Sequence, residues 1–245
     1  MQYVAPPIIE AVVQYSFSDN LDIKVVSSAC DVLMDHFASK TDRRSVSSTI
    51  DLQTAQVKSD VQHIGFELVN GDGNRILILD TNSVVLSQKG TYSGWGDFVS
   101  WIDAELTNII TLIGDVSVSR LGVRFVNRLD VPLQDNLGRF EDFVTVYPRD
   151  FSFGGTNVTR FIVSFSREIP ETNHGFNITC GTVESPAPAS LGILLDIDAF
   201  AVFLDGRPMS NLSETLAELR EVKNKVFEES ITDAAREKFG VRKNA

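Results

Sequence analysis

Residues 76–86 read ILILDTNSVVL, and residues 193–203 read ILLDIDAFAVF. When the first aspartates of the two phrases are aligned, Gly90 falls on Gly206, and a loop and a helix-like pattern follow each glycine. Self-similarity at a fixed offset is typical of a duplicated structural unit, although ILxLD is also a common strand pattern that can recur by chance. Because the glycine and the helix follow in register both times, we expect two fused half-repeats.

The segments after the two glycines both predict an amphipathic helix. Apolar residues recur there at spacings of three and four, which places them on one face of a helix. They are Phe98, Ile102, Leu106, Ile109 and Ile113 in the first segment, and Leu212, Leu216, Leu219, Val222 and Val226 in the second. Asn211 and Glu214 have the spacing of a capping box, so we expect the second helix to open there.

The remaining elements give both halves the same order of strand, helix, three antiparallel strands and helix. Alternating apolar residues predict strands at 6–17, 60–69, 75–80 and 83–89 in the first half-repeat (1–115), and at 119–129, 157–168, 175–183 and 192–204 in the second (116–245). Further helices are expected at 22–37, more weakly at 138–144, and between Thr232 and Gly240. The segments 70–74 and 171–175 are rich in the residues that close hairpins.

This order predicts an α+β fold, in which the two halves share one curved antiparallel sheet with helices on one face. By topological analogy alone, the layout is that of a TATA-binding-protein-like saddle. We expect a single compact unit and not two separate domains.

Composition predicts a soluble cytoplasmic protein. Hydrophobic residues make up 43% of the 245 residues, and no run approaches the roughly 18 apolar residues that a membrane span needs. The opening MQYVAPPIIE does not have the pattern of a secretory signal. Cys30 and Cys180 are the only cysteines, and we expect two free thiols in a reducing compartment. The net charge of −11 disfavours nucleic-acid binding and is compatible with a basic partner.

No group of residues in the sequence specifies catalysis. His36, His63 and His174 lie in different elements, without carboxylates or cysteines at metal-ligand spacing. The chain has no P-loop and no nucleophile elbow. Asp196 and Asp198 could form a carboxylate pair for a divalent cation, but matching positions in the other phrase favour a turn. We therefore expect no catalytic residues, no metal and no cofactor, and the chain reads more readily as a binding protein than as an enzyme.

The central strand carries the most informative pattern. Arg120, Arg124 and Arg128 alternate along it and face away from its apolar residues Leu121, Val123 and Phe125. Arg160 on the next long strand and Glu10 on the first strand could join them. Guanidinium groups suit carboxylates and phosphates, so one interpretation is an anion-binding or partner-binding patch. The alternative is a cross-strand ladder of ion pairs with Glu10, Glu67 and Glu168. Asn127 falls on the apolar face, where a polar group needs partners.

The loop before the first amphipathic helix contains Gly94, Trp95 and Gly96. Its amides could hold an anion at the start of the helix, but the repeated glycine at position 90 favours a simple turn. Trp95 is interpreted as a loop anchor on the surface or as part of an interface.

Three segments resemble an uncharacterised, sporadically distributed bacterial protein family of about this length. They are PPIIEAV (6–12), LGVRFVNRLDVP (121–132) and FEESITDAAREKFG (227–240). The patchy distribution of that family implies an accessory or neutralising subunit of the toxin–antitoxin or phage-defence type. Together with the missing catalytic groups, this favours a non-catalytic protein that binds another protein, and exposed sheet edges also allow a homodimer. The alternative is a protein or enzyme that binds a small anion or nucleotide on the sheet face.

Overall fold

The protein has an α+β architecture in this computed structural model, which describes residues 3–51, 56–134, 137–148 and 158–240. The strands are β1 (Ile8–Phe17), β2 (Ser39–Asp51), β3 (Gln56–Val69), β4 (Arg75–Asp80), β5 (Ser83–Lys89), β6 (Ser117–Gln134), β7 (Leu137–Gly138), β8 (Ile162–Glu168), β9 (His174–Glu184) and β10 (Ser190–Pro208). The helices are α1 (Ile23–Leu33), α2 (Trp95–Ile113), α3 (Ser213–Ser230) and α4 (Asp233–Phe239), with short 3-10 turns η1 (Met34–His36), η2 (Phe140–Asp142) and η3 (Met209–Asn211).

Nine of the described strands form one antiparallel sheet in the order β2-β3-β4-β5-β1-β6-β10-β9-β8. Strands β1 and β6 lie side by side near its middle, with Val13 opposite Val123. The short strand β7 pairs with the end of β6, outside this order. The turns expected at 70–74 and 171–175 close the β3–β4 and β8–β9 hairpins, as predicted.

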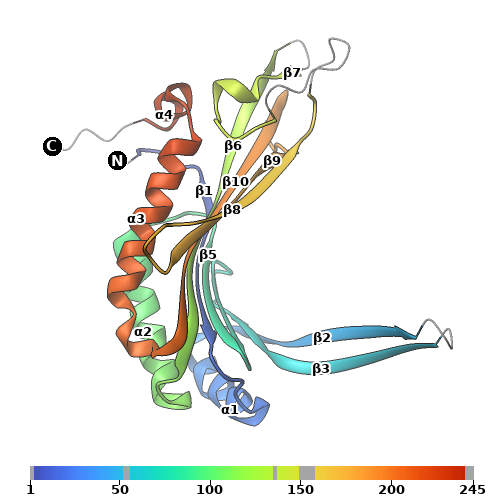
Figure 1. Ribbon diagram of the computed structural model, residues 1–245, viewed down its shortest axis with the longest axis vertical. Helices are drawn as coiled ribbons and strands as arrows, with labels where there is room; N and C mark the ends of the chain where they lie inside the picture. The colour runs from blue at the N-terminus through green and yellow to red at the C-terminus, as the bar shows by residue number, and fades with distance from the viewer. Residues whose placement is uncertain (1–2, 52–55, 135–136, 149–157, 241–245) are drawn as a thin grey trace.

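The sheet is curved, and its two sides are covered differently (Figure 1). Helices α1, α2 and α3 lie on the convex side, and none of the described helices covers the concave side. Strands β2 and β3 extend beyond the other strands as a two-stranded ribbon, and they are drawn in blue and cyan in Figure 1. This leaves a concave sheet surface that is open to solvent.

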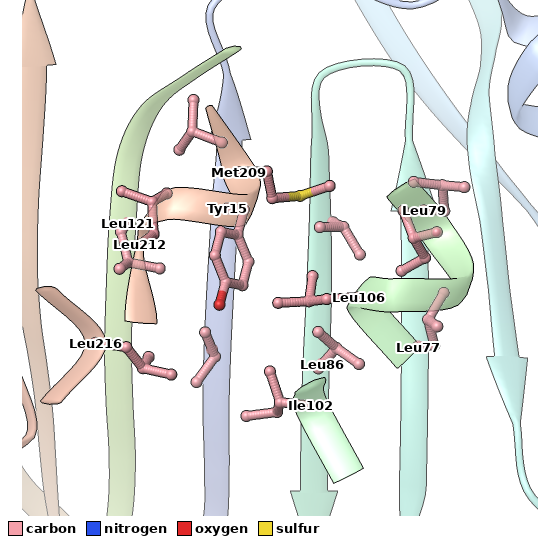
Figure 2. Packing of buried hydrophobic residues seen from close by; sticks show 14 of the residues in the cluster. Tyr15, Leu77, Leu79, Leu86, Ile102, Leu106, Leu121, Met209, Leu212 and Leu216 are labelled. Atoms are coloured by element: carbon pink, nitrogen blue, oxygen red, sulfur yellow. The ribbon is translucent and has the colours of Figure 1, made fainter. Parts of the chain in front are cut away.

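The main hydrophobic core lies between the sheet and the helices on its convex side. Alternate residues of the central strands point into this layer because successive side chains of a strand face opposite sides. Figure 2 shows part of the cluster: Tyr15, Leu77, Leu79, Leu86 and Leu121 from the sheet, Ile102 and Leu106 from α2, and Met209, Leu212 and Leu216 around the start of α3. Each fully buried Leu or Ile side chain stabilises the fold by about 1.5–3 kcal/mol.

A second core cluster lies under the end of α3 and under α4. It contains Leu129, Ile193, Leu195, Phe227 and Phe239, and the last two rings stack with their centroids 6.4 Å apart. The α4 helix begins at the expected cap, because the Thr232 hydroxyl accepts a hydrogen bond from the Ala235 amide. One continuous sheet thus contributes to both clusters.

Most of the strands and helices predicted from hydrophobic spacing are confirmed to within a few residues, but several local details differ from the predictions. Strand β2 was not predicted, because the segment 39–51 is mostly polar. This strand lies at the edge of the sheet and pairs with β3 only. The helix expected at 138–144 is only the single turn η2, and Val144 forms a β-bridge with Ile231. Asn211 belongs to η3, and α3 starts after Leu212 without a side-chain cap.

The two similar phrases adopt different structures. Residues 76–86 form the β4–β5 hairpin, which turns at Thr81 and Asn82. Residues 193–203 lie within the single strand β10. The prediction that Asp196 and Asp198 are turn residues is therefore wrong. The glycines that follow do correspond, because Gly90 and Gly206 both have positive φ angles, of 76° and 69°.

Candidate functional site

The arginines of the central strand lie on the concave side of the sheet, as their alternation predicted. Arg124 donates two hydrogen bonds to Asp196, with Nε–Oδ1 and Nη2–Oδ2 distances of 2.8 and 2.6 Å. Arg120 Nη2 lies 2.6 Å from Asp198 Oδ2. These contacts run between the neighbouring strands β6 and β10, and they form an ion-pair ladder of four residues.

Further polar and aromatic groups hold the ladder in place. Asn177 on β9 donates a hydrogen bond to Asp198 over 3.0 Å, and the Phe200 ring lies 4.9 Å from the Arg120 guanidinium. The hydrogen bond with Asp196 is the main cause that raises the pKa of Arg124, and the charge of Glu10 adds to it. Both arginines are thus held by carboxylates of the same chain.

A shallow depression of about 560 Å³ lies over this ladder on the concave face. Gly122 forms part of its floor, since a Cβ atom there would lie 2.6 Å from Arg120 Nη1. Val12 and Gln14 of β1 form its other side. The depression is shallow, and its charged side chains are paired within the chain, so no free cationic group among those lining it is left for an anion.

The other arginines and Glu10 do not join the ladder through ion pairs. Arg128 Nε lies 3.5 Å from Asp130 Oδ1, and Glu10 accepts a hydrogen bond from Ser87 over 2.7 Å. Arg160 precedes β8, so its predicted place on a strand is wrong, and the start of that predicted strand at position 157 lies outside the described residues. Within the described chain, Arg160 forms no ion pair with the aspartates that the three arginines of β6 contact.

The expected carboxylate partners of the arginines also need correction. The arginines pair with aspartates of β10 and β6, and not with the expected partners Glu10, Glu67 and Glu168. The signal was present in the sequence, because Asp196 and Asp198 alternate in the same way as the arginines. It was misread because the phrase comparison placed both aspartates in a turn.

The β2–β3 arm, which we define as residues 44–51 and 56–64, is the second notable feature of this region. It starts at an irregularity in strand pairing after Arg43, beyond the last residues that pair with β4. Val46 lies opposite Val61, and Val57 is on the same face of the ribbon. Their exposed fractions are 66%, 57% and 63%. The arm therefore presents a stripe of three exposed valines, interrupted by the Ser48–Ser59 pair, that is not covered by the rest of the described chain.

Trp95 lies on the opposite, convex side of the sheet. Its ring packs at 6.2 Å from Phe98 and 6.4 Å from Phe125, and the Arg220 guanidinium lies 5.2 Å from it. It lines a cavity that also contains Asn127, whose Nδ2 donates hydrogen bonds to two backbone carbonyl groups. Trp95 is thus half-buried and forms a wall of this cavity, while its expected role as a surface anchor or part of an interface stays a prediction.

Sequence reasoning missed Lys223 in the same cavity. This lysine is seven residues after Leu216 and four after Leu219, so it continues the sheet-facing stripe of α3. This helical spacing could have identified Lys223, but only apolar residues were assigned to the buried face.

The cysteines and histidines form no reactive centre in the described part of the chain. Cys30 and Cys180 are buried free thiols, and burial raises the pKa of each to about 12. His63 contacts the Gly65 carbonyl oxygen at 2.9 Å, and His174 lies 3.4 Å from Glu218. No three His, Cys, Asp or Glu residues among those described are grouped so that they could hold a metal ion.

Comparison with protein-family models and with curated proteins finds no match for this chain. Among the described helices, none combines the length and the apolar character that crossing a membrane requires.

Proposed function

We propose that this protein is a non-catalytic binding subunit that holds another protein with the concave face of its sheet and the β2–β3 arm. The arm carries the proposal. An isolated two-stranded ribbon is marginally stable in water, and this one extends an exposed valine stripe beyond the sheet. Contact with a partner protein would bury that stripe and fix the ribbon in place.

The charge of the concave face supports a partner that brings its own positive groups. The ladder arginines are already paired with Asp196 and Asp198, and Glu10 adds a further negative charge nearby. The whole chain has a net charge of −11, which attracts a basic protein over long range. The same charge opposes binding to nucleic acid through this face.

A duplicated saddle-like origin would explain the shape of the concave surface. The strand order β1-β5-β4-β3 on one side of the sheet parallels β6-β10-β9-β8 on the other. In the first case a glycine with positive φ, Gly90, follows β5, and in the second Gly206 lies near the end of β10; a long helix comes afterwards in both. These correspondences support two half-repeats, although the similar phrases themselves fold differently. The resemblance to a sporadic bacterial family would fit an accessory or neutralising role.

The proposal is tested with the protein from its native cells. The tagged chain is purified, and a co-purifying protein is identified and then prepared separately to measure its affinity by calorimetry. We expect the double variant Val46→Ser/Val61→Ser to weaken binding by about tenfold or more, since two buried valines contribute over 1.4 kcal/mol.

Val32→Ser is the matched control, because Val32 is an equally exposed valine on α1 at the convex side. It should leave the affinity unchanged. The proposal fails if no protein co-purifies, or if the arm variant binds the partner as tightly as the wild type does.

A further inference from the structure

A cavity of about 640 Å³ lies on the convex side, remote from the concave face. Three segments enclose it: residues 3–8 before and at the start of β1, residues 92–96 before and at the start of α2, and residues 220–228 of α3. Its floor is the sheet surface at Phe125 and Asn127. We call it the Lys223 cavity after the most buried of the three cationic residues that line it, the others being Arg220 and Lys225.

Lys223 is an uncompensated charge in this cavity. Its exposed fraction is only 8%, and its Nζ lies 3.8 Å from the centroid of the Phe125 ring. No carboxylate oxygen of the described residues lies within 4.0 Å of this ammonium group, and it donates no hydrogen bond within the described chain. A cation–π contact replaces only part of the hydration that burial removes.

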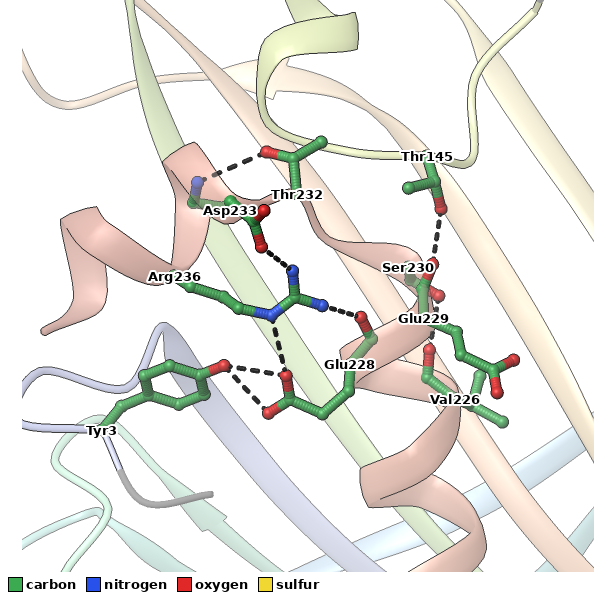
Figure 3. A network of polar contacts seen from close by, with 10 residues as sticks. Tyr3, Thr145, Val226, Glu228, Glu229, Ser230, Thr232, Asp233 and Arg236 are labelled. Carbon is green, nitrogen blue, oxygen red and sulfur yellow. Dashed lines mark hydrogen bonds and ion pairs between the residues drawn. The ribbon is translucent and has the colours of Figure 1, made fainter. Parts of the chain in front are cut away.

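The two glutamates that line the cavity are engaged elsewhere. Glu228 accepts hydrogen bonds from the Tyr3 hydroxyl at 2.8 and 2.9 Å and from Arg236 at 3.1 Å (Figure 3). Glu221 is exposed and lies 3.6 Å from Arg220. Neither carboxylate therefore neutralises Lys223 directly, so a negative group from outside the chain has a place beside it.

Other groups around the cavity suit the same kind of ligand. Helix α2 begins after Gly94, which has no side chain to accept hydrogen bonds from the backbone amides of the first turn. Such amides can bind a negative group. Tyr92 and Trp95 supply aromatic walls, and Tyr92 packs edge-on against Phe125 at 5.4 Å. Asp97 in the first turn is exposed and is not among the lining residues.

We propose that the Lys223 cavity binds a small organic anion. The carboxylate or phosphate group of this ligand contacts the Lys223 ammonium, and its carbon skeleton lies against the aromatic rings of Tyr92, Trp95 and Phe125. The size of the cavity is within the range of pockets that enclose small molecules. The site is separate from the concave face, so it operates whether or not that face binds a protein.

Binding at this site depends on pH in a defined direction. Burial, the largest cause, and the charge of Arg220 lower the pKa of Lys223 to about 7, while the charges of Glu221 and Glu228 act in the opposite direction. The other titratable groups around it are Tyr3, Tyr92 and Lys225. Because the anion binds the charged amine, the affinity is highest below about pH 7 and falls as the pH rises above that value.

The test is calorimetric titration with three probes: adenosine monophosphate, benzoate and inorganic phosphate. We expect adenosine monophosphate or benzoate to bind the wild type at pH 6.5 and to bind more weakly at pH 8.5. Lys223→Met should weaken that binding by about tenfold or more, as loss of a charge-assisted contact does. Inorganic phosphate should bind less tightly, because it has no ring to place against the aromatic walls.

Lys24→Met is the matched control, since Lys24 is exposed on α1 and should leave the affinity unchanged. Circular dichroism checks that Lys223→Met is folded, which we expect because methionine suits the apolar surroundings. The proposal is overturned if none of the three probes binds at 10 mM, or if Lys223→Met binds them as the wild type does. Phosphate binding as tightly as both ring-bearing anions would also overturn it.

Discussion

At the scale of single residues, Lys223 is a buried charged side chain without an ion pair among the described residues. A lysine in the sheet-facing stripe of α3 gives up most of its hydration and gains a ring contact with Phe125 in return. Natural proteins tolerate such costs mainly where a residue has a further role. The position is therefore informative about both stability and function.

Replacing Lys223 with methionine should stabilise the protein near neutral pH. The pKa of Lys223 is about 7 in the folded protein and 10.5 ordinarily, so the unfolded chain binds more protons between these values and stability rises with pH there. We expect Lys223→Met to be more stable by roughly 3 to 5 kcal/mol at pH 6.5, with the difference shrinking towards pH 10. Urea unfolding at several pH values measures this. Equal pH dependence of the two proteins would contradict it.

Two glycines offer a matched comparison of backbone strain and steric fit. Gly90 and Gly206 both have φ near +70°, which costs other residues about 1–2 kcal/mol. A Cβ atom at Gly206 would also lie 2.1 Å from Ser117 Oγ, whereas at Gly90 it would meet no atom within 4 Å.

We therefore expect Gly206→Ala to lose more stability in urea unfolding than Gly90→Ala. Both should lose at least about 1 kcal/mol. Equal losses would show that Ser117 moves aside without cost.

At the scale of elements, the β2–β3 arm is the least supported part of the described chain. Its strands pair only with each other beyond Arg43, and its valines are exposed. In the free protein we expect its amides to exchange with solvent far faster than those of β1 and β6, which are paired on both sides.

The arm valines should matter little for folding. Val46→Ser/Val61→Ser should shift the unfolding free energy by less than about 0.5 kcal/mol, as exposed substitutions usually do. A thermal or urea melt checks this. A large loss of stability would mean that the valines pack on the chain itself, and the arm would then not be a free binding surface.

Helices and central strands were predictable because their apolar spacing follows what they bury. The stripes of α2 and α3 repeat at three and four residues, and both helices pack on one face of the sheet. The arm was not predictable in the same way, because residues 39–48 of β2 bury no side chain fully, and the sequence SKTDRRSVSSTID (39–51) shows no apolar alternation. The spacing of apolar residues indicates which side chains an element buries. An element that buries few side chains therefore cannot be recognised from this spacing.

The site was predicted in part for the same reason. The alternation of Arg120, Arg124 and Arg128 placed them correctly on one face of a strand. Their partners Asp196 and Asp198 were misplaced, because two similar phrases were assumed to share one conformation. Lys223 was missed because its burial depends on the packing of α3 against the sheet, which spacing of apolar residues alone does not reveal.

At the scale of the whole molecule, one antiparallel sheet separates two different surfaces. The concave side has the charge-paired ladder and continues into the arm, while the convex side carries the helices and the Lys223 cavity. The two core clusters share Val222 at their border, so the sheet and α3 join both into one structure. A partner on the concave side would thus meet a central surface that is backed by helices and an arm that has no helix behind it.

Hydrogen exchange of the protein alone and in complex with the partner from its native cells tests the central claim most directly. We expect the amides of the β2–β3 arm to exchange rapidly in the free protein and to become at least about tenfold slower in the complex. Amides of α1, α2 and α3 should change little. Slow exchange of the arm in the isolated monomer, or an arm that exchanges equally fast in the complex, would contradict the account.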